Sequence, residues 1–505
     1  MTLMDYRYSL LSSVAEEHRK RPVPFRDGPA DALAVLDRNR EQFRRWGLQA
    51  CFGKAKLYGF LFLLMVMFLI TVSYILTGER KGLILTPSPY RIRTIVGPGQ
   101  FPFNLTSARD YANIKLVVKT IVSKVEFSSR HVPELKDLVH NEPHMFSVVP
   151  RKFLPNVKNP CWYEEHSGNI TADPYGKNMY ARYSRRFRTV CNILRKAFQE
   201  HLFSQGGRYY RMRCLPYFYI IGQPKCGTTD LYDRLKLHPD VRFTTMKEPH
   251  WWTRKRFGIV RISEGFHDRY PVEDYLDLFD MAAYQIQDHL AGNTSRSLNK
   301  RNIITGEASA STLWDNNAWV YFYDNSTDGE PPFLIQDFVH AVQPEAKFIV
   351  MLRDPVERLY SDYLYFSIAN KSAEDFHERV SESLQLFEGV PGGGLSAFLC
   401  VQHHPQQRHA RQITILRLED HASNRKYTMH TVFDFLRLGP LTEQKEAEIT
   451  RSPASNTRRP ADKNLGPMLP VTKEILGDFY SPFNEKLAKV LKNDSFMWHN
   501  HAKHM

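Results

Sequence analysis

The stretch Phe218–Pro239 constrains this chain most, because it reads as a strand, a glycine-bearing loop and a helix in immediate succession. The apolar run Phe218–Ile221 predicts a buried strand, and the loop after it closes on Thr228 and Thr229 before the helix begins. Such a loop points backbone N–H groups and a helix N-terminus at one spot, which suits a phosphate or sulfate group. The sequence therefore predicts an anion site at the end of this strand.

The spacing of Gly222 and Gly227 matches half of a nucleotide-binding P-loop. Ordinary P-loops carry a lysine directly after the second glycine. Here Thr228 stands at that position, and Lys225 lies inside the loop instead. This departure argues against an ordinary ATPase or kinase and favours a different phosphate-bearing donor.

The composition predicts a folded, basic protein. Hydrophobic residues make up 42% of the 505 residues and aromatic residues 13%, so the chain can form a core and is not wholly disordered. The net charge of +14 suits an acidic partner such as a nucleic acid, an anionic lipid or an anionic polysaccharide. A basic surface that serves only solubility fits the charge equally well.

The segment Leu57–Thr77 is uncharged over 21 residues, long enough to cross a bilayer. Six lysines and arginines lie in the 20 residues before it and four in the 20 residues after it. This bias predicts a cytosolic N-terminus and a single-pass type II protein whose main part is lumenal. We expect a cytosolic tail (1–56), a transmembrane helix (57–77), a stem (78–110), a lumenal extension (111–213) and a catalytic domain (214–505).

Glycosylation sequons and cysteines agree with a lumenal location. Six N-x-S/T sequons follow the predicted span, at Asn104, Asn169, Asn293, Asn325, Asn370 and Asn493. Five cysteines also follow it, at positions 161, 191, 214, 226 and 400. An oxidising lumen permits disulfides, but the odd number leaves at least one cysteine unpaired, and the pairing cannot be read from the sequence.

Beyond Cys214 the pattern alternates between strands and helices. Strands are expected at 241–243, 302–305, 347–352 and 413–418, and helices at 355–370 and 426–438. This alternation predicts an α/β fold with a P-loop-like parallel sheet flanked by helices. In such sheets ligands bind beyond the carboxyl ends of the strands.

A second motif, residues 353–363, reads RDPVERLYSDY and follows the strand at 347–352. Asp354 can cap a helix and Pro355 fits its first turn. Arg353 then lies at the strand tip and Ser361 less than two turns into the helix, where both can reach one phosphate. Taken alone, this motif is also an ordinary helix start.

Together the two motifs resemble those of the Golgi carbohydrate sulfotransferases, which use 3′-phosphoadenosine 5′-phosphosulfate (PAPS) as donor. The resemblance covers about residues 111–498. It implies that the first loop grips the 5′-phosphosulfate and that Arg353 and Ser361 hold the 3′-phosphate. It also implies a C-terminal loop that closes over the nucleotide. The implied donor-binding residues are Gly222, Lys225, Cys226, Gly227, Thr228, Thr229, Arg353, Ser361, Arg458 and Arg459.

The chemistry of sulfuryl transfer suits Lys225 and two further side chains, Glu248 and His250. Negative charge develops on the bridging oxygen as the 5′-phosphate leaves, and the Lys225 ammonium can stabilise it there. A sugar hydroxyl needs a base. The stretch 247–252, KEPHWW, resembles the family's region around its proposed base, which implies Glu248 in that role and His250 as alternative base or positioning group. The two tryptophans and the following RKR predict an acceptor platform, although core packing of both tryptophans fits equally well.

The chain departs from the family at two places. Ala308 follows Glu307 where relatives often have a lysine. Residues 389–412 are shorter than in relatives and rich in Gly, Pro, His and Gln, which predicts a loop where a helix is expected. Neither departure touches the phosphate motifs. No metal-ligand pattern is present in the sequence, and PAPS chemistry needs no protein-bound metal.

The resemblance thus implies a Golgi membrane enzyme that transfers sulfate from PAPS to the 6-hydroxyl of N-acetylgalactosamine 4-sulfate in chondroitin or dermatan sulfate. Its partners would be a sulfated glycosaminoglycan and the membrane, not nucleic acid, and a homo-oligomer remains open. Three alternatives are kept: another glycan acceptor such as heparan sulfate, an inactive lumenal binder of polyanions or nucleotides, and a P-loop kinase.

Overall fold

A computed structural model of the chain describes residues 108–125, 132–259, 268–292, 303–316, 318, 331–367, 371–388 and 412–498. The predicted cytosolic tail, membrane span and almost all of the stem lie outside these residues, as does the atypical 389–412 segment apart from Gln412. Within the described ranges no helix has the length and apolar character needed to cross a membrane. The predicted domain boundaries therefore stay predictions.

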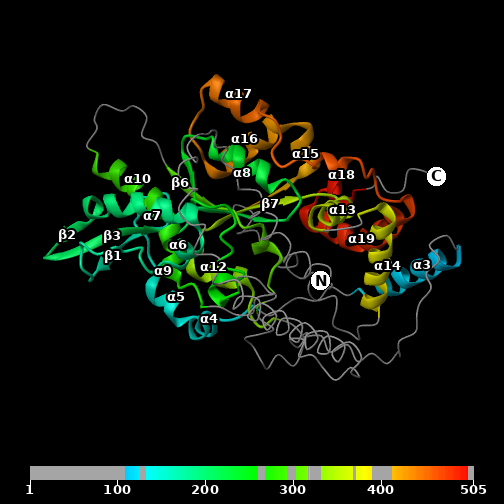
Figure 1. Cartoon of the computed structure of the whole chain (residues 1–505), viewed down its shortest axis with the longest axis horizontal. Coiled ribbons are helices and arrows are strands. Elements are labelled where there is room, and N and C mark those ends of the chain that lie inside the picture. Colours follow the sequence, from blue (N-terminus) through cyan, green and yellow to red (C-terminus); the bar gives the residue numbers. More distant parts are fainter. Residues whose placement is uncertain are drawn as a thin grey trace, which may run out of the picture. The chain divides into compact units, whose positions relative to one another are not determined.

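The central element is a five-stranded parallel sheet with the strand order β5-β6-β4-β7-β8. The strands are β4 (Phe218–Gly222), β5 (Val241–Phe243), β6 (Ile304–Glu307), β7 (Lys347–Leu352) and β8 (Ile413–Arg417). Because β4 is the middle strand, the glycine loop after it opens at the centre of the carboxyl edge (Figure 1). The predicted parallel sheet is confirmed.

Helices cover both faces of this sheet, as the alternation of side chains along β4 requires. Phe218 and Ile220 pack on one face with helices α8 (Thr228–Lys236) and α16 (Arg425–Leu436). Tyr219, between them, packs on the other face with helix α12 (Ile335–Val342). Figure 1 shows α8 and α16 on one side of the strands and α12 on the opposite side.

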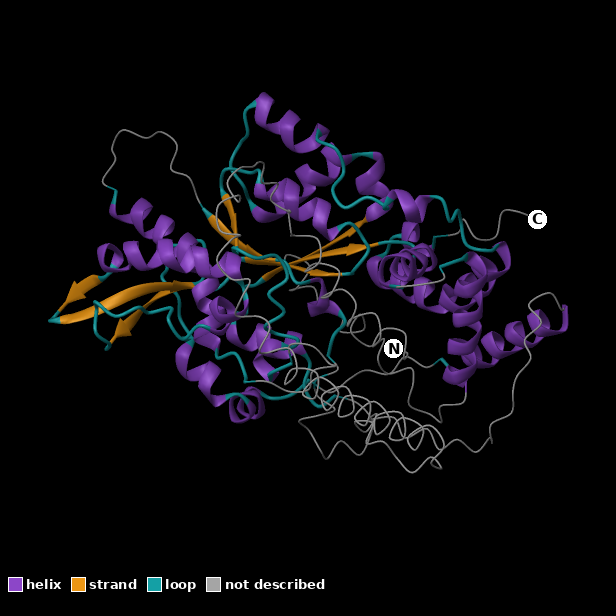
Figure 2. Ribbon diagram, in the orientation of Figure 1, coloured by secondary structure: helices purple, strands orange, loops and turns teal. Residues whose placement is uncertain are grey.

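A second, three-stranded antiparallel sheet precedes the central one and was not predicted. Its order is β1-β3-β2, with β1 at Cys161–His166, β2 at Phe203–Gln205 and β3 at Arg208–Cys214 (Figure 2). Cys161 and Cys214 are directly opposite each other in this sheet and form a disulfide. Of the other cysteines in the described ranges, Cys191 and Cys226 are free and buried.

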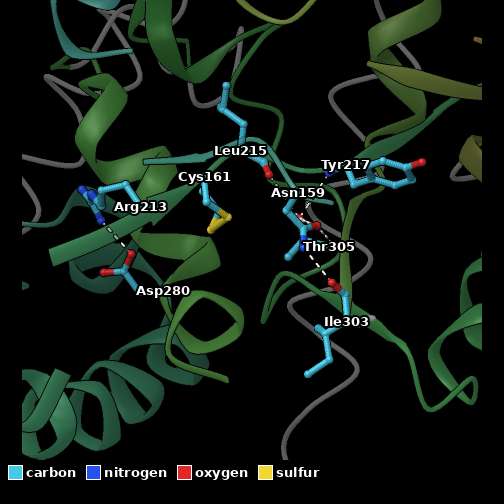
Figure 3. The surroundings of a disulfide bond; sticks show 9 residues. Asn159, Cys161, Arg213, Leu215, Tyr217, Asp280, Ile303 and Thr305 are labelled. Carbon is cyan, nitrogen blue, oxygen red and sulfur yellow. Dashed lines mark hydrogen bonds and ion pairs between the residues drawn. A yellow bond between two sulfur atoms is a disulfide. The ribbon is translucent and has the colours of Figure 1, made fainter. Parts of the chain in front are cut away.

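Asn159 and Arg213 fasten this small sheet to its surroundings (Figure 3). The Asn159 amide donates to the carbonyl of Ile303 at 2.7 Å and accepts from the N–H of Thr305 at 2.8 Å, so it bridges to β6. The Arg213 guanidinium is fully buried and donates to two carboxylates, Asp277 at 2.7 Å and Asp280 at 2.8 Å. These contacts fix the chain that leads into β4.

A third group of helices packs beside the sheet around its own apolar core. It contains α3 (Ala108–Ser123), α13 (Pro355–Phe366), α14 (Ala373–Glu388) and α19 (Pro470–Leu491). Helix α13 starts directly after β7, so this core orients the second phosphate motif.

Two of the remaining helices, α6 (Met179–Tyr183) and α7 (Arg185–Phe198), are separated by Ser184, whose hydroxyl accepts from the N–H of Phe187 at 3.3 Å and caps the start of the second helix. The other helices are α4 (Leu135–Asn141), α5 (Pro143–Val148), α9 (Val272–Leu276), α10 (Asp280–Ala291), α15 (Leu418–Ser423), α17 (Glu443–Arg451) and α18 (Pro460–Lys463).

Candidate active site

The loop between β4 and α8 needs its two glycines. Gly227 caps α8 with φ of 87°, and a Cβ there would lie 2.7 Å from Leu418. Gly222 has φ of 150°, and a Cβ there would lie 2.8 Å from Leu313. Only glycine fits both backbone and space at these positions. The loop therefore wraps tightly around the start of α8, where unpaired N–H groups face an incoming anion.

Lys225 and Arg353 meet at this loop. Arg353 follows β7, the neighbour of β4, and its Nη1 lies 3.5 Å from the Lys225 carbonyl oxygen. The Lys225 ammonium lies 3.6 Å from the centre of the Tyr365 ring on α13. Burial lowers the pKa of Lys225 to about 8; Arg459 and Arg353 act in the same direction. The two motifs that the sequence separates by more than a hundred residues thus bring two cations together at one edge of the sheet.

The remaining residues of the two motifs line the same region. Asp354 caps α13 by accepting from the N–H of Val356 at 3.0 Å, as predicted. Ser361 is half-buried and lies one helical turn before Tyr365, on the side of α13 that faces Lys225. Cys226 is buried, and burial raises its pKa to about 12, so its thiol stays protonated.

Thr228 and Thr229 are the first two residues of α8, directly after the glycine loop. Thr228 is buried and Thr229 is half-buried. Their hydroxyls can donate hydrogen bonds to an anion, in addition to the backbone N–H groups of the loop. The donor-binding roles of these residues stay predictions.

The two C-terminal arginines differ from each other. Arg459 donates to Asp462 at 2.7 Å and to the carbonyl of Leu364 at 2.9 Å, so it ties the C-terminal loop to the end of α13. Arg458 is exposed, with its guanidinium 5.6 Å from the ring of Tyr360. Arg459 also lies near Lys225, because its guanidinium is 5.5 Å from the Tyr365 ring. The donor-binding roles of both arginines stay predictions.

Residues 247–252, here called the Glu248 strap, follow β5 and carry the predicted base. The strap bends sharply, with φ of 61° at Glu248 and 53° at His250. The Glu248 carboxylate, 31% exposed, accepts from the Lys247 ammonium at 2.5 Å and lies 3.6 Å from the His250 Nε2. Burial acts to raise the pKa of Glu248, but the charge and the hydrogen bond of the Lys247 ammonium outweigh it and hold that pKa below its ordinary value. Glu248 is therefore ionised at neutral pH, as a base must be.

His250 supports Glu248 as a neutral ring. Burial, with the nearby charge of Arg254, lowers the pKa of His250 to about 3. Its Nδ1 is 2.7 Å from the hydroxyl of Ser311, and its backbone N–H donates to the hydroxyl of Ser309 at 3.1 Å. A ring held in this way positions the carboxylate beside it.

The predicted tryptophan platform is wrong. Trp251 and Trp252 are only 4% and 3% exposed, and Trp251 stacks on Tyr275 in the apolar core. Of the basic run that follows, Arg254 pairs with Asp315 and Arg256 is buried. The alternative of core packing applies, because two large rings packed among buried tyrosines gain more from burial than from exposure.

Sequence reasoning missed four contributors to the site. Tyr365 contacts Lys225, and Asp362 raises the pKa of that lysine against the effect of burial. Glu307 lies buried at the end of β6, and residues 309–311 support the Glu248 strap. The helical spacing of Ser361, Asp362 and Tyr365 could have indicated that Asp362 and Tyr365 belong to the site, because side chains three and four positions apart lie on the same face of a helix.

The predictions on metal ligands and on glycosylation sequons can be compared with the structure only in part. Among the described residues, no group of three or more His, Cys, Asp or Glu side chains is arranged to hold a metal ion. Of the six sequons, only Asn169 and Asn493 lie in described ranges.

Comparisons with known proteins agree with the motifs. The family model described as "Sulfotransferase family" matches residues 216–443. Human carbohydrate sulfotransferase 15 is 53% identical over 512 residues, covering 92% of this chain and 90% of the relative. The rat protein of the same name is 54% identical over 505 residues, with the same coverage.

Among solved structures, a sulfotransferase from Alicyclobacillus acidocaldarius matches 55% of this chain and 97% of its own, at 20% identity and a TM-score of 0.33. The assignment rests on the sequence relatives, which align over nearly the whole chain, and on the family model, which spans both phosphate motifs. The chain therefore belongs to the sulfotransferase family and is an enzyme.

Proposed function

We propose that the chain transfers sulfate from PAPS to the 6-hydroxyl of N-acetylgalactosamine 4-sulfate in chondroitin or dermatan sulfate. The observation that carries this proposal is the meeting of Lys225 and Arg353 at the same sheet edge as Glu248. Family membership implies PAPS as donor. The relatives are named carbohydrate sulfotransferases, which favours a carbohydrate acceptor.

The residues fit a donor with a phosphosulfate at one end and a phosphate at the other. In the proposed reaction the Glu248 carboxylate takes the proton of the acceptor hydroxyl, and the oxygen of that hydroxyl bonds to the sulfur of the donor. The bond between sulfur and the bridging oxygen breaks, and the electron pair stays with the 5′-phosphate. Lys225, charged below its pKa of about 8, stabilises that oxygen.

A mixed cationic and aromatic surface next to the base supports a sulfated sugar as acceptor. Lys255, whose N–H donates to the carbonyl of His250 at 3.0 Å, has its ammonium 5.1 Å from the ring of Tyr270. Tyr183 is 57% exposed and stacks on Tyr270, and the Arg182 guanidinium is 5.7 Å from the Tyr183 ring. Cations suit sulfate and uronate groups, and aromatic faces suit sugar rings.

We further propose a Golgi membrane location with the catalytic domain in the lumen. The apolar stretch 57–77 and the excess of lysine and arginine before it support this topology. The Cys161–Cys214 disulfide suits an oxidising compartment, and the sequon at Asn169 lies at an exposed position. A homo-oligomer stays a prediction.

The test is to incubate the purified protein with radiolabelled PAPS and separate samples of chondroitin 4-sulfate, dermatan sulfate, chondroitin 6-sulfate and heparan sulfate. Disaccharide analysis then locates the label. The proposal expects label at carbon 6 of N-acetylgalactosamine 4-sulfate. Label in heparan sulfate alone would assign another glycan.

Two further arms separate the remaining alternatives. Binding of desulfated donor (PAP) without any transfer would indicate an inactive binder. Turnover of ATP with magnesium would indicate a kinase instead. Either outcome would overturn the proposed reaction.

A further inference from the structure

Glu307 is a buried carboxylate for which the proposed reaction has no role. It ends β6 and is 1% exposed. Strand β6 lies between β5 and β4 in the sheet. The end of β6 therefore lies between the Glu248 strap, which follows β5, and the Lys225 loop, which follows β4. A titratable group at this place can influence both halves of the site.

A chain of hydrogen bonds connects Glu307 to the Glu248 strap. The hydroxyl of Ser309 donates to the Glu307 Oε1 at 2.5 Å and accepts from the N–H of His250 at 3.1 Å. The N–H of Glu248 donates to the carbonyl of Ala308 at 3.0 Å. Both sharply bent residues of the strap are thus anchored on the segment that begins with Glu307.

The second carboxyl oxygen of Glu307 lacks such a contact. Its Oε2 is buried and has no hydrogen-bond partner among the described residues. An ionised carboxylate in that position is costly, because one oxygen would carry charge without a donor or water. A protonated acid avoids this cost.

The charged and titratable groups that face Glu307 come from four elements. The Glu248 strap contributes Glu248 and Lys247. The tyrosine hydroxyls of Tyr180, Tyr219 and Tyr275, from α6, β4 and α9, are close enough for the Glu307 charge to raise their pKa values. Burial raises the pKa of Glu307 to about 7; the Ser309 hydrogen bond opposes this, and the charge of Glu248 adds to it.

We propose that Glu307 is a positioning residue for sulfate transfer, which holds the Glu248 strap in its reactive geometry through Ser309. The inference rests on the proposed role of Glu248 as base. The donor, the sulfated acceptor and Glu248 are all anionic, so a further negative charge below them would repel substrate. A neutral acid keeps the hydrogen bond to Ser309 without adding that charge.

The test compares Glu307→Gln and Glu307→Ala in the purified full-length protein, by kcat/KM from pH 5.5 to 9. In the wild type, kcat/KM should fall as pH rises through about 7, where Glu307 loses its proton. Glu307→Gln, which stays neutral, should keep kcat/KM within about threefold at pH 6.5 and move the alkaline fall up by about one pH unit. Glu307→Ala should lose at least about tenfold at pH 6.5, because Ser309 loses its acceptor.

Binding of PAP, measured by calorimetry, should change less than about threefold in both variants, which shows that they fold. The exposed Glu382→Gln on α14 is the matched control and should keep the wild-type pH profile. An unshifted alkaline limb in Glu307→Gln, or full activity in Glu307→Ala, would overturn the inference. Full turnover in Glu248→Gln would instead overturn the proposed function on which it rests.

Discussion

Replacing Asp230 tests how the donor loop and the C-terminal loop depend on each other. Asp230 lies in the first turn of α8 and is buried. It accepts from Arg234 Nε and His421 Nε2, both at 2.7 Å, and from the N–H of Ser455, also at 2.7 Å. Arg234, 2% exposed, also donates to the carbonyl of Ser452 at 2.9 Å. This network fastens the loop that carries Arg458 to the helix that starts at the glycine loop.

The expected loss of stability in Asp230→Ala follows from the burial of Arg234. Asp230→Ala removes the carboxylate and leaves the buried guanidinium with carbonyl and hydroxyl partners alone, and breaking such a pair costs about 3–5 kcal/mol of stability. For a folded part of this size that loss corresponds to roughly 5 °C in melting temperature. Because the C-terminal loop loses its anchor, the affinity for PAP should also fall, by about tenfold.

The assay is thermal unfolding of the purified protein with and without PAP, with Asp233→Ala on the same helix as control. Burial acts to raise the pKa of Asp230, but hydrogen bonds from His421 and Arg234 outweigh it and hold that pKa below its ordinary value of 3.8. The stabilisation is therefore present above about pH 4 and is lost as pH falls further. A loss of less than about 1 °C at pH 7 in Asp230→Ala would refute the reasoning.

Four further outcomes are expected. Lys225→Ala and Glu248→Gln should each slow transfer at least about a hundredfold in a radiolabel assay, with PAP binding largely retained; unchanged turnover would remove the assigned role. The pKa of Lys225 is about 8, so its ammonium is lost above that pH; in the Glu307→Gln background, the residual kcat/KM of Lys225→Arg, which stays charged, should not decline between pH 8 and 9. Replacing Cys161 and Cys214 by serine should cost about 4 kcal/mol in a denaturant titration, because the disulfide closes a loop of 53 residues. Gly306→Ala should abolish soluble expression, since a Cβ there overlaps phenylalanine rings from β4 and β5.

Much of the central sheet could be predicted because its strands are short, apolar and separated by turns. The strands expected at 241–243 and 347–352 are observed with those bounds. The strand expected at 302–305 is observed at Ile304–Glu307, because the polar residues Thr305 and Glu307 are buried by neighbours that a local pattern does not reveal. The small antiparallel sheet escaped prediction, since its strand Arg208–Cys214 is rich in arginine and reads as surface.

The residues of the site could be predicted where the backbone conformation or a bound anion requires a particular residue type. The glycines, the helix cap at Asp354 and the cations beside them follow from the needs of an anion-binding loop. Trp251 was assigned to the acceptor because of its residue type. Its actual partner, Tyr275, is not a local neighbour in the sequence, so no local pattern indicated that this side chain serves packing. Arg459 pairs with Asp462 three residues further on, and its role in donor binding stays a prediction.

The strand order separates two tasks. Residues proposed to activate the acceptor follow β5 and β6, whereas residues proposed to bind the donor follow β4 and β7. Since β6 and β4 are neighbours, the boundary between the tasks runs along one pair of strands. A lineage with this arrangement can diversify the sugars it modifies by changing one half of the sheet edge, while its source of sulfate is conserved by the other half.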